Sequence, residues 1–101
     1  MAVAFFTPSA NEDALQIWEY ISQFSDERAD RWLDDLDEQC QLIADNPQMG
    51  RARPEIQSDA RSFPLGNYTI YYRRTGANIE VFRVLHAARD IEKQFPPSAS
   101  G

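Results

Sequence analysis

The sequence predicts an α+β domain in which an N-terminal strand and an antiparallel two-helix hairpin pack on a C-terminal antiparallel β-meander. Two observations indicate this class. Apolar residues recur at three- and four-residue spacing in the first half, as on one face of a helix, whereas the second half holds short β-branched and aromatic runs bounded by turn residues. At 101 residues the chain has the size of one domain, which we expect at residues 1–95, before a flexible tail at 96–101.

The first half predicts one strand and two helices. Residues 2–6 are apolar strand formers, and Thr7 followed by Pro8 is a typical helix start, because proline lacks the N–H that would have no partner there. We expect one helix from Pro8 to about Ser25 and a second from about Ser25 to the residue before Pro47. Neither helix can bury its apolar stripe alone, so the pair should form a hairpin that packs on another layer.

The second half predicts three strands, at residues 60–63, 68–74 and 79–86, after a loop at 46–50. The connections at 64–67 and 75–78 have the composition of hairpin turns, so the three strands should form a meander. Apolar residues are shared too evenly to show which face carries the helices. Strict alternation divides each strand into two opposing sets of residues. On the second strand Tyr68, Ile70 and Tyr72 oppose Thr69, Tyr71 and Arg73, and on the third Val81, Arg83 and Leu85 oppose Phe82, Val84 and His86.

Charge is divided unevenly along the chain. Residues 1–50 hold two Arg against eleven Asp and Glu, whereas residues 51–101 carry a net charge of +3, and the whole chain has a net charge of −6. This division suggests a basic surface on an otherwise acidic body, suited to an acidic partner. Strong sequence-independent binding to nucleic acid is not expected, because phosphate contacts need a clear excess of Lys and Arg.

Other features exclude whole classes of protein. No apolar run approaches the roughly 20 residues of a membrane span, and the N-terminus lacks the basic start of a signal peptide, so we expect a cytoplasmic protein with no membrane partner. The single cysteine, Cys40, cannot form an internal disulfide or a site of several thiolates. We therefore expect neither a metal nor a cofactor.

Four sequence strings carry a family resemblance. In chain order they are Asn46-Pro47-Gln48-Met49-Gly50-Arg51-Ala52-Arg53-Pro54-Glu55, Arg61-Ser62-Phe63-Pro64-Leu65-Gly66-Asn67-Tyr68, Tyr72-Arg73, and Arg83-Val84-Leu85-His86-Ala87-Ala88-Arg89-Asp90. Their order and spacing resemble the ParE family of toxins in the ParE/RelE superfamily, over nearly the whole chain. Ala87 departs from the pattern, since relatives more often carry glycine there.

The resemblance implies a bacterial toxin of a type II toxin–antitoxin system. Such a toxin is held inactive by a ParD-like antitoxin, whose flexible C-terminal segment folds on it. The complex typically represses its own operon, so contact with operator DNA would be indirect, through the antitoxin. ParE-type toxins characteristically poison DNA gyrase and block replication, and this implies the same target here.

An enzymatic alternative comes from RelE-type relatives, which are ribosome-dependent messenger-RNA endonucleases. RNA cleavage needs a general base, a general acid and cations over the phosphate. Candidates are His86 as base, Tyr68, Tyr71 or Tyr72 as acid, and Arg61, Arg73 and Arg83 as phosphate clamps. The Lys and Arg cluster that such enzymes bring to the ribosome is missing, so we expect no catalytic residues. A third alternative is a degenerate member that binds antitoxin but harms nothing.

Arginine residues of the second half are the main candidates for binding an antitoxin. Arg61, Arg73 and Arg83 on the meander are expected to form a basic surface for acidic antitoxin side chains. Arg51 and Arg53 fit two interpretations equally: contacts with a partner, or exposed ion pairs within the chain, worth only about 0–1 kcal/mol each.

The remaining candidates are an arginine, a histidine and two aromatic residues. Arg89 fits both a partner contact and a bond within the chain. His86 is expected to lock the turn after the last strand by bonding a carbonyl or Asp90, ahead of any role in catalysis. Tyr20 and Trp32 fit two interpretations: outward apolar anchors on the helical hairpin for a segment that folds on binding, or ordinary core packing, which is the more frequent role of such apolar stripes.

Overall fold

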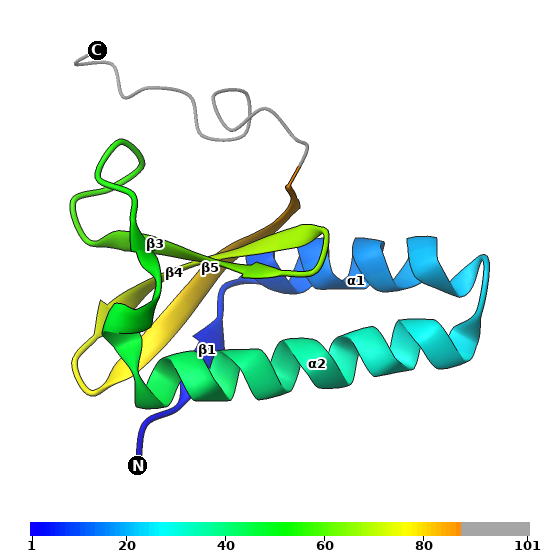
Figure 1. Ribbon diagram of the computed structural model, residues 1–101, viewed down its shortest axis with the longest axis horizontal. Helices are drawn as coiled ribbons and strands as arrows, with labels where there is room; N and C mark the ends of the chain where they lie inside the picture. Colours follow the sequence, from blue (N-terminus) through cyan, green and yellow to red (C-terminus); the bar gives the residue numbers. More distant parts are fainter. Residues whose placement is uncertain (88–101) are drawn as a thin grey trace.

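The computed structural model describes residues 1–87, in which two helices pack on one face of a five-stranded sheet (Figure 1). Arg89 and the predicted tail at 96–101 lie outside the described residues. The elements in chain order are β1 (Ala4–Phe6), α1 (Pro8–Ser22), α2 (Asp26–Asp45), the short 3-10 helix η1 (Pro47–Met49), β2 (Arg51–Ala52), β3 (Ala60–Leu65), β4 (Tyr68–Thr75) and β5 (Asn78–His86). The predicted α+β class, with its hairpin and its meander, is confirmed.

The sheet has the strand order β1-β5-β4-β3-β2, so the first and the last strand of the described chain are neighbours. Strand β1 runs parallel to β5, with Phe6 opposite Val81, and every other pair of neighbouring strands is antiparallel. No helix within residues 1–87 is long and apolar enough to cross a membrane.

The helix boundaries follow from side-chain caps. The Thr7 hydroxyl accepts a 3.1 Å hydrogen bond from the Ala10 N–H, which confirms the predicted start of α1. Helix α1 ends at Ser22, three residues before the predicted end. Ser25 takes an extended conformation, with φ −167°, and its hydroxyl accepts the Arg28 N–H at 3.2 Å, so it is the N-cap of α2 and cannot extend α1.

The core lies between the helical hairpin and the sheet. Small residues of α1 let that helix approach the sheet closely, and α2 supplies larger apolar side chains. The buried residues of the core are Ala10, Ala14, Leu36, Cys40, Ile43, Ala44, Ile70, Tyr72, Ile79, Val81 and Val84.

A β-bulge corrects the predicted alternation on β5. Tyr71 lies opposite Arg83, but Tyr72 lies opposite Val81, so Phe82 is an extra residue on β5. Cross-strand neighbours share a face of a sheet, and Val84 lies opposite Ile70 on the core face. The core face of β5 therefore changes from odd to even positions at the bulge, and Arg83 does not share it with Val81.

The strand β2 and the end of β3 also differ from prediction. β2 has only two residues, too few for a pattern to reveal it. β3 continues through Pro64 to Leu65 instead of ending at residue 63. Because β2 pairs with β3 only at Ser62 and Arg61, Pro64 lies beyond the reach of β2, where its missing N–H costs no strand bond.

Candidate functional site

The helical hairpin extends past the end of the sheet (Figure 1), and two hollows lie beside it. One hollow there, of about 650 Å³, lies between α1 and the end of β5, and a second, of about 410 Å³, lies between the hairpin and the turn joining β3 to β4. Both are lined by Tyr20, Asn67 and Tyr68. We name the two together the hairpin groove, lined by Asp13, Gln16, Ile17, Tyr20, Ile21, Phe24, Arg28, Arg31, Trp32, Asp35, Asn67, Tyr68, Arg83, Val84, Leu85 and His86.

Aromatic rings form the middle of the hairpin groove. Tyr68 packs edge-to-face against Trp32 on one side and His86 on the other, with ring centroids 5.5 and 5.3 Å apart. Tyr20 and Phe24 form a similar pair at 5.5 Å, yet they stay 58% and 69% exposed. Apolar rings at this exposure favour a binding surface over a core.

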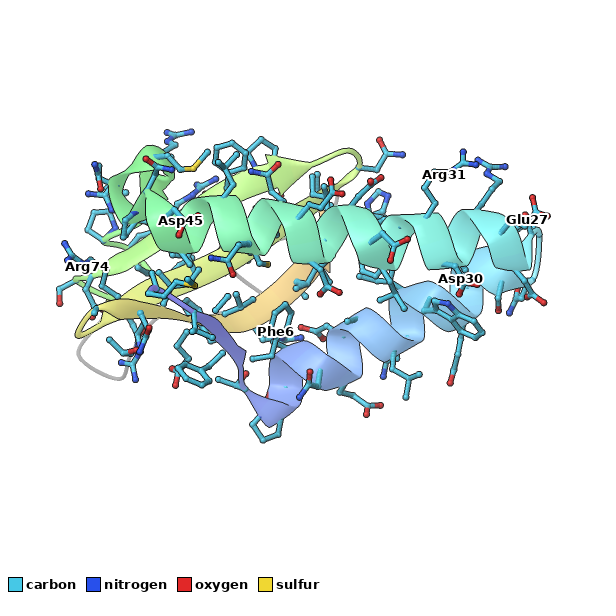
Figure 2. The ribbon with its side chains drawn as sticks, turned by 90° about the horizontal axis from the view of Figure 1, so that it is seen from below. Phe6, Glu27, Asp30, Arg31, Asp45 and Arg74 are labelled. Atoms are coloured by element: carbon cyan, nitrogen blue, oxygen red, sulfur yellow. The ribbon has the colours of Figure 1, made fainter. Side chains whose placement is uncertain are left out.

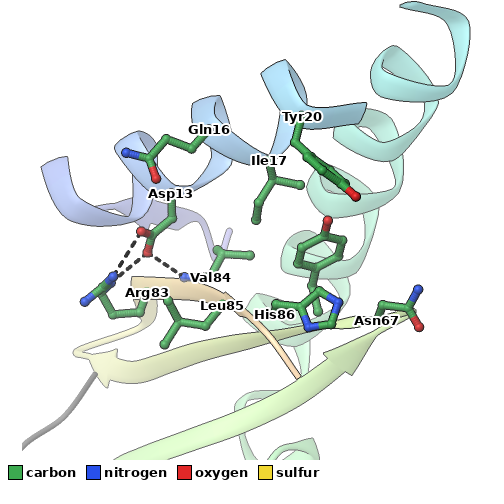
Figure 3. A pocket seen from close by; sticks show the side chains of 10 residues that line it. Asp13, Gln16, Ile17, Tyr20, Asn67, Arg83, Val84, Leu85 and His86 are labelled. Atoms are coloured by element: carbon green, nitrogen blue, oxygen red, sulfur yellow. Dashed lines mark hydrogen bonds and ion pairs between the residues drawn. The ribbon is translucent and has the colours of Figure 1, made fainter. Parts of the chain in front are cut away.

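Asp13 and Arg83 close one end of the groove (Figure 3). The Arg83 guanidinium donates to both carboxylate oxygens of Asp13, at 2.7 and 3.1 Å. Strand β1 pairs only as far as Phe6 opposite Val81, so the later part of β5 has no neighbouring strand on that side, and the Val84 N–H donates to Asp13 instead, at 3.0 Å. The hydrogen bond to Asp13 raises the pKa of Arg83, against the opposing effect of burial.

The other predicted meander arginines also bind groups of their own chain. Arg61 donates to the carbonyls of Gly50 and Gln48, at 2.7 and 3.3 Å, and thereby holds the segment before β2. Arg73 forms a 3.1 Å ion pair with Glu80 across β4 and β5. A partner would have to compete with these bonds for either guanidinium.

The two loop arginines differ from each other. Arg53 donates to the Ser62 hydroxyl at 2.8 Å and forms a 3.4 Å ion pair with Glu55, which agrees with the expected ion pair within the chain. Arg51, on β2, is exposed, and its guanidinium makes no hydrogen bond or ion pair within residues 1–87. Neither residue lines the hairpin groove.

Two arginines that the sequence interpretation missed line the groove instead. Arg28 and Arg31 are exposed on the first turns of α2, and neither guanidinium has a hydrogen bond or ion pair in the described part of the chain. In Figure 2, Arg31 points away from α1, whereas Asp30 lies toward α1 and accepts a 3.0 Å bond from the Trp18 indole. The sequence contains a signal for them: they are the only basic residues between positions 8 and 45.

The structure brings four of the predicted partner-binding residues together in the hairpin groove: Tyr20, Trp32, Arg83 and His86. Trp32 agrees with the core-packing interpretation, since it is half-buried against the core, and its indole N–H has no partner within residues 1–87. His86 is exposed beside Tyr68, and its suggested bond to Asp90 lies outside the described residues.

Comparison with known proteins identifies the class. The sequence model of a family described as "ParE toxin of type II toxin-antitoxin system, parDE" matches residues 4–91. "Toxin ParE1" of Mycobacterium tuberculosis (strain ATCC 25618 / H37Rv) is 33% identical over 89 residues, covering 86% of this chain and 91% of the relative. "Toxin ParE1" of Caulobacter vibrioides is 31% identical over 78 residues, covering 76% and 80%.

A solved structure described as "Chromosomal ParDE TA system from P. aeruginosa" shares the fold, with a TM-score of 0.70 at 22% identity over 85% of this chain and 96% of that chain. Fold and sequence thus define a toxin of a toxin–antitoxin system. The chain belongs to the ParE toxin family.

Proposed function

We propose that this toxin is neutralised by a ParD-like antitoxin, a segment of which docks in the hairpin groove, and that the free toxin inhibits DNA gyrase in the cytoplasm and blocks replication. The observation that carries the antitoxin site is the exposure of Tyr20 and Phe24 beside Tyr68 in a concave surface. A segment that folds on binding gains its affinity by covering such rings.

Charge and family support the same pairing. The solved structure with this fold is described as a ParDE system, which favours a ParD-type partner. With a net charge of −6, the toxin itself is poorly suited to DNA, so contact with operator DNA is assigned to the antitoxin. Gyrase is proposed as the target because the resemblance to ParE toxins implies it.

The nuclease alternative is less well supported by the geometry of residues 1–87. The Tyr72 hydroxyl donates to the Pro47 carbonyl at 2.7 Å and accepts the Gly50 N–H at 2.9 Å, and burial raises the pKa values of Tyr68, Tyr71 and Tyr72. The three suggested phosphate clamps bind separate groups: Arg61 the Gly50 carbonyl, Arg73 Glu80, and Arg83 Asp13. A shared phosphate site would require these bonds to rearrange.

A plasmid assay with purified proteins tests the target. Gyrase, ATP and supercoiled plasmid are incubated with the toxin, and linear DNA released by detergent and protease is measured on a gel. We expect linear DNA that depends on both toxin and gyrase and that disappears when the ParD-like protein is added first. Intact plasmid, with mRNA cut on ribosomes in a parallel reaction, would instead support the RelE-type alternative.

Growth assays complete this test. Expression without antitoxin should arrest cells and activate the DNA-damage response. Arrest with translation stopped and no DNA damage would contradict gyrase as the target, and normal growth would favour the degenerate-member alternative.

Tyr20→Ala tests the docking site. It removes an exposed ring, so it should preserve the fold while weakening neutralisation by the antitoxin. A matched control is Leu15→Ala, which removes an exposed side chain of α1 that does not line the groove.

A further inference from the structure

We infer that Arg28 and Arg31 select the partner of the hairpin groove: the docking segment is amphipathic, and acidic side chains on it meet these two guanidinium groups while an apolar side chain covers Phe24, Trp32 and Tyr68. This inference rests on the proposed antitoxin docking and specifies its chemistry. It assigns partner specificity to the second hollow of the groove, which is lined by none of Arg61, Arg73 and Arg83.

Basic charge on the helical hairpin is confined to the groove. Between positions 8 and 45 the chain has eleven Asp and Glu and only two basic residues, and both basic residues line the groove. An acidic segment is therefore repelled by most of the hairpin and attracted at this one place. Complementary charge of this kind directs encounter and disfavours other docking positions.

The guanidinium groups of Arg28 and Arg31 are available to bind a partner. Arg53, Arg61, Arg73 and Arg83 all donate to groups of their own chain. Arg28 and Arg31 donate to none within residues 1–87, so a partner carboxylate gains their hydrogen bonds without breaking others. Charge-assisted bonds from arginine to carboxylate are among the stronger polar contacts.

Helix geometry sets the spacing of the expected acids. Arg28 and Arg31 are three residues apart, about 4.5 Å along α2 at a rise of about 1.5 Å per residue. Two carboxylates one turn apart on a docked helix, at about 5.4 Å, match this spacing. Asp35 lines the same hollow one turn beyond Arg31, so the matching segment carries no acid at that end.

The aromatic side chains beside these arginines provide an apolar contact surface for the docked segment. Phe24 is largely exposed, and Trp32 and Tyr68, which pack edge-to-face on each other, line the same hollow. A side chain such as Leu or Phe on the docked segment would remove this surface from water. Buried aromatic anchors flanked by arginine are the usual composition of an interface hot spot.

Calorimetric titration with the ParD-like protein encoded beside the toxin gene tests the inference. We compare the wild-type toxin with Arg28→Ala, Arg31→Ala, the double reversal Arg28→Glu/Arg31→Glu, and the control Arg74→Ala, at low and at physiological salt. Arg74 is a matched control because it is exposed and makes no hydrogen bond or ion pair within residues 1–87, and because it lies at the end of the molecule opposite Glu27, away from the groove (Figure 2). Circular dichroism melts confirm that each variant is folded.

We expect the Arg28→Ala and Arg31→Ala variants each to bind about tenfold more weakly, the double reversal at least about 100-fold more weakly, and Arg74→Ala within about twofold of wild type. The salt dependence of binding should also fall in the groove variants. Equal binding by wild type and the double reversal would overturn the inference while leaving the proposed function intact. Absence of binding to the wild type would overturn both.

Discussion

Asp13 offers the sharpest test of how the fold is held at the groove. Replacing it with alanine removes two bonds from Arg83 and one from the Val84 N–H. The Asp13 side chain is 11% exposed and that of Arg83 is 26% exposed, so the guanidinium loses its carboxylate where water reaches it only in part. One-sided loss of a fully buried pair costs about 3–5 kcal/mol, and the partial exposure places Asp13→Ala near about 3 kcal/mol.

Urea unfolding followed by tryptophan fluorescence measures this loss. A loss of about 3 kcal/mol corresponds to a fall of roughly 12–24 °C in Tm for a domain of this size. Glu12→Ala is the matched control, because Glu12 is the exposed neighbour and its side chain accepts only a 3.1 Å bond from Gln16. We expect less than about 0.5 kcal/mol for this control.

Asp13→Asn and a double-mutant cycle with Arg83→Ala separate charge from shape. Asparagine can still accept the Val84 N–H, so it should recover part of the stability. The coupling energy between Asp13 and Arg83 should exceed about 1.5 kcal/mol. If Asp13→Ala were no worse than Glu12→Ala, the cost of removing both charges from water would cancel their attraction, and our account of this contact would be wrong.

Two further predictions concern Gly50 and Cys40. Gly50→Ala places a Cβ against the Tyr72 hydroxyl and 2.9 Å from the Ser62 carbonyl oxygen, so it should lower the free energy of unfolding in urea by about 3 kcal/mol. The control Gly66→Ala, in open space at φ 58°, should lower it by about 1 kcal/mol. Equal losses in the two variants would contradict this prediction. Burial, reinforced by the Asp37 carboxylate, raises the pKa of the Cys40 thiol from 9.0 to about 12, so native protein at pH 8 should react with a thiol reagent at least about 100-fold more slowly than denatured protein. The folded state binds the Cys40 proton more tightly than the unfolded state does. The contribution of Cys40 to the free energy of unfolding should therefore be fully present below pH 9 and decrease as the pH rises toward about 12, and the decrease should be smaller in Cys40→Ala.

Local signals predicted the elements well. Thr7 and Ser25 cap their helices as the sequence indicated, since a cap needs only a hydroxyl and the N–H three residues later. Gly66 and Gly76 adopt positive φ in the two predicted hairpin turns. These features depend on neighbours within a few positions, so the sequence records them directly.

The bulge at Phe82 is a feature that periodicity could not reveal. Strict alternation continues through it, but the register of β5 against β4 changes there, and the core face moves from Val81 to Val84. Register depends on the packing of whole strands and on the helices above them. The faces of β5 were therefore open in the sequence and are decided by the tertiary structure.

The residues of the candidate site were partly predictable from the sequence, but their arrangement in space was not. Tyr20, Trp32, Arg83 and His86 were selected from the sequence and do line the groove, although Trp32 also serves the core. Their gathering depends on the overhang of the hairpin, which no local pattern describes.

The sequence by itself determined the family, the order of the two long helices and of every strand except β2, and an acidic hairpin followed by an arginine-rich sheet. Only the tertiary structure decided which arginines are free. Asp13 and Arg83 are 70 positions apart, and Arg61 meets the Gly50 carbonyl across a turn of the chain. Because ion pairs depend on distance in space, only the fold shows that Arg61, Arg73 and Arg83 bind groups of their own chain, whereas Arg28 and Arg31 line the groove without such bonds within residues 1–87.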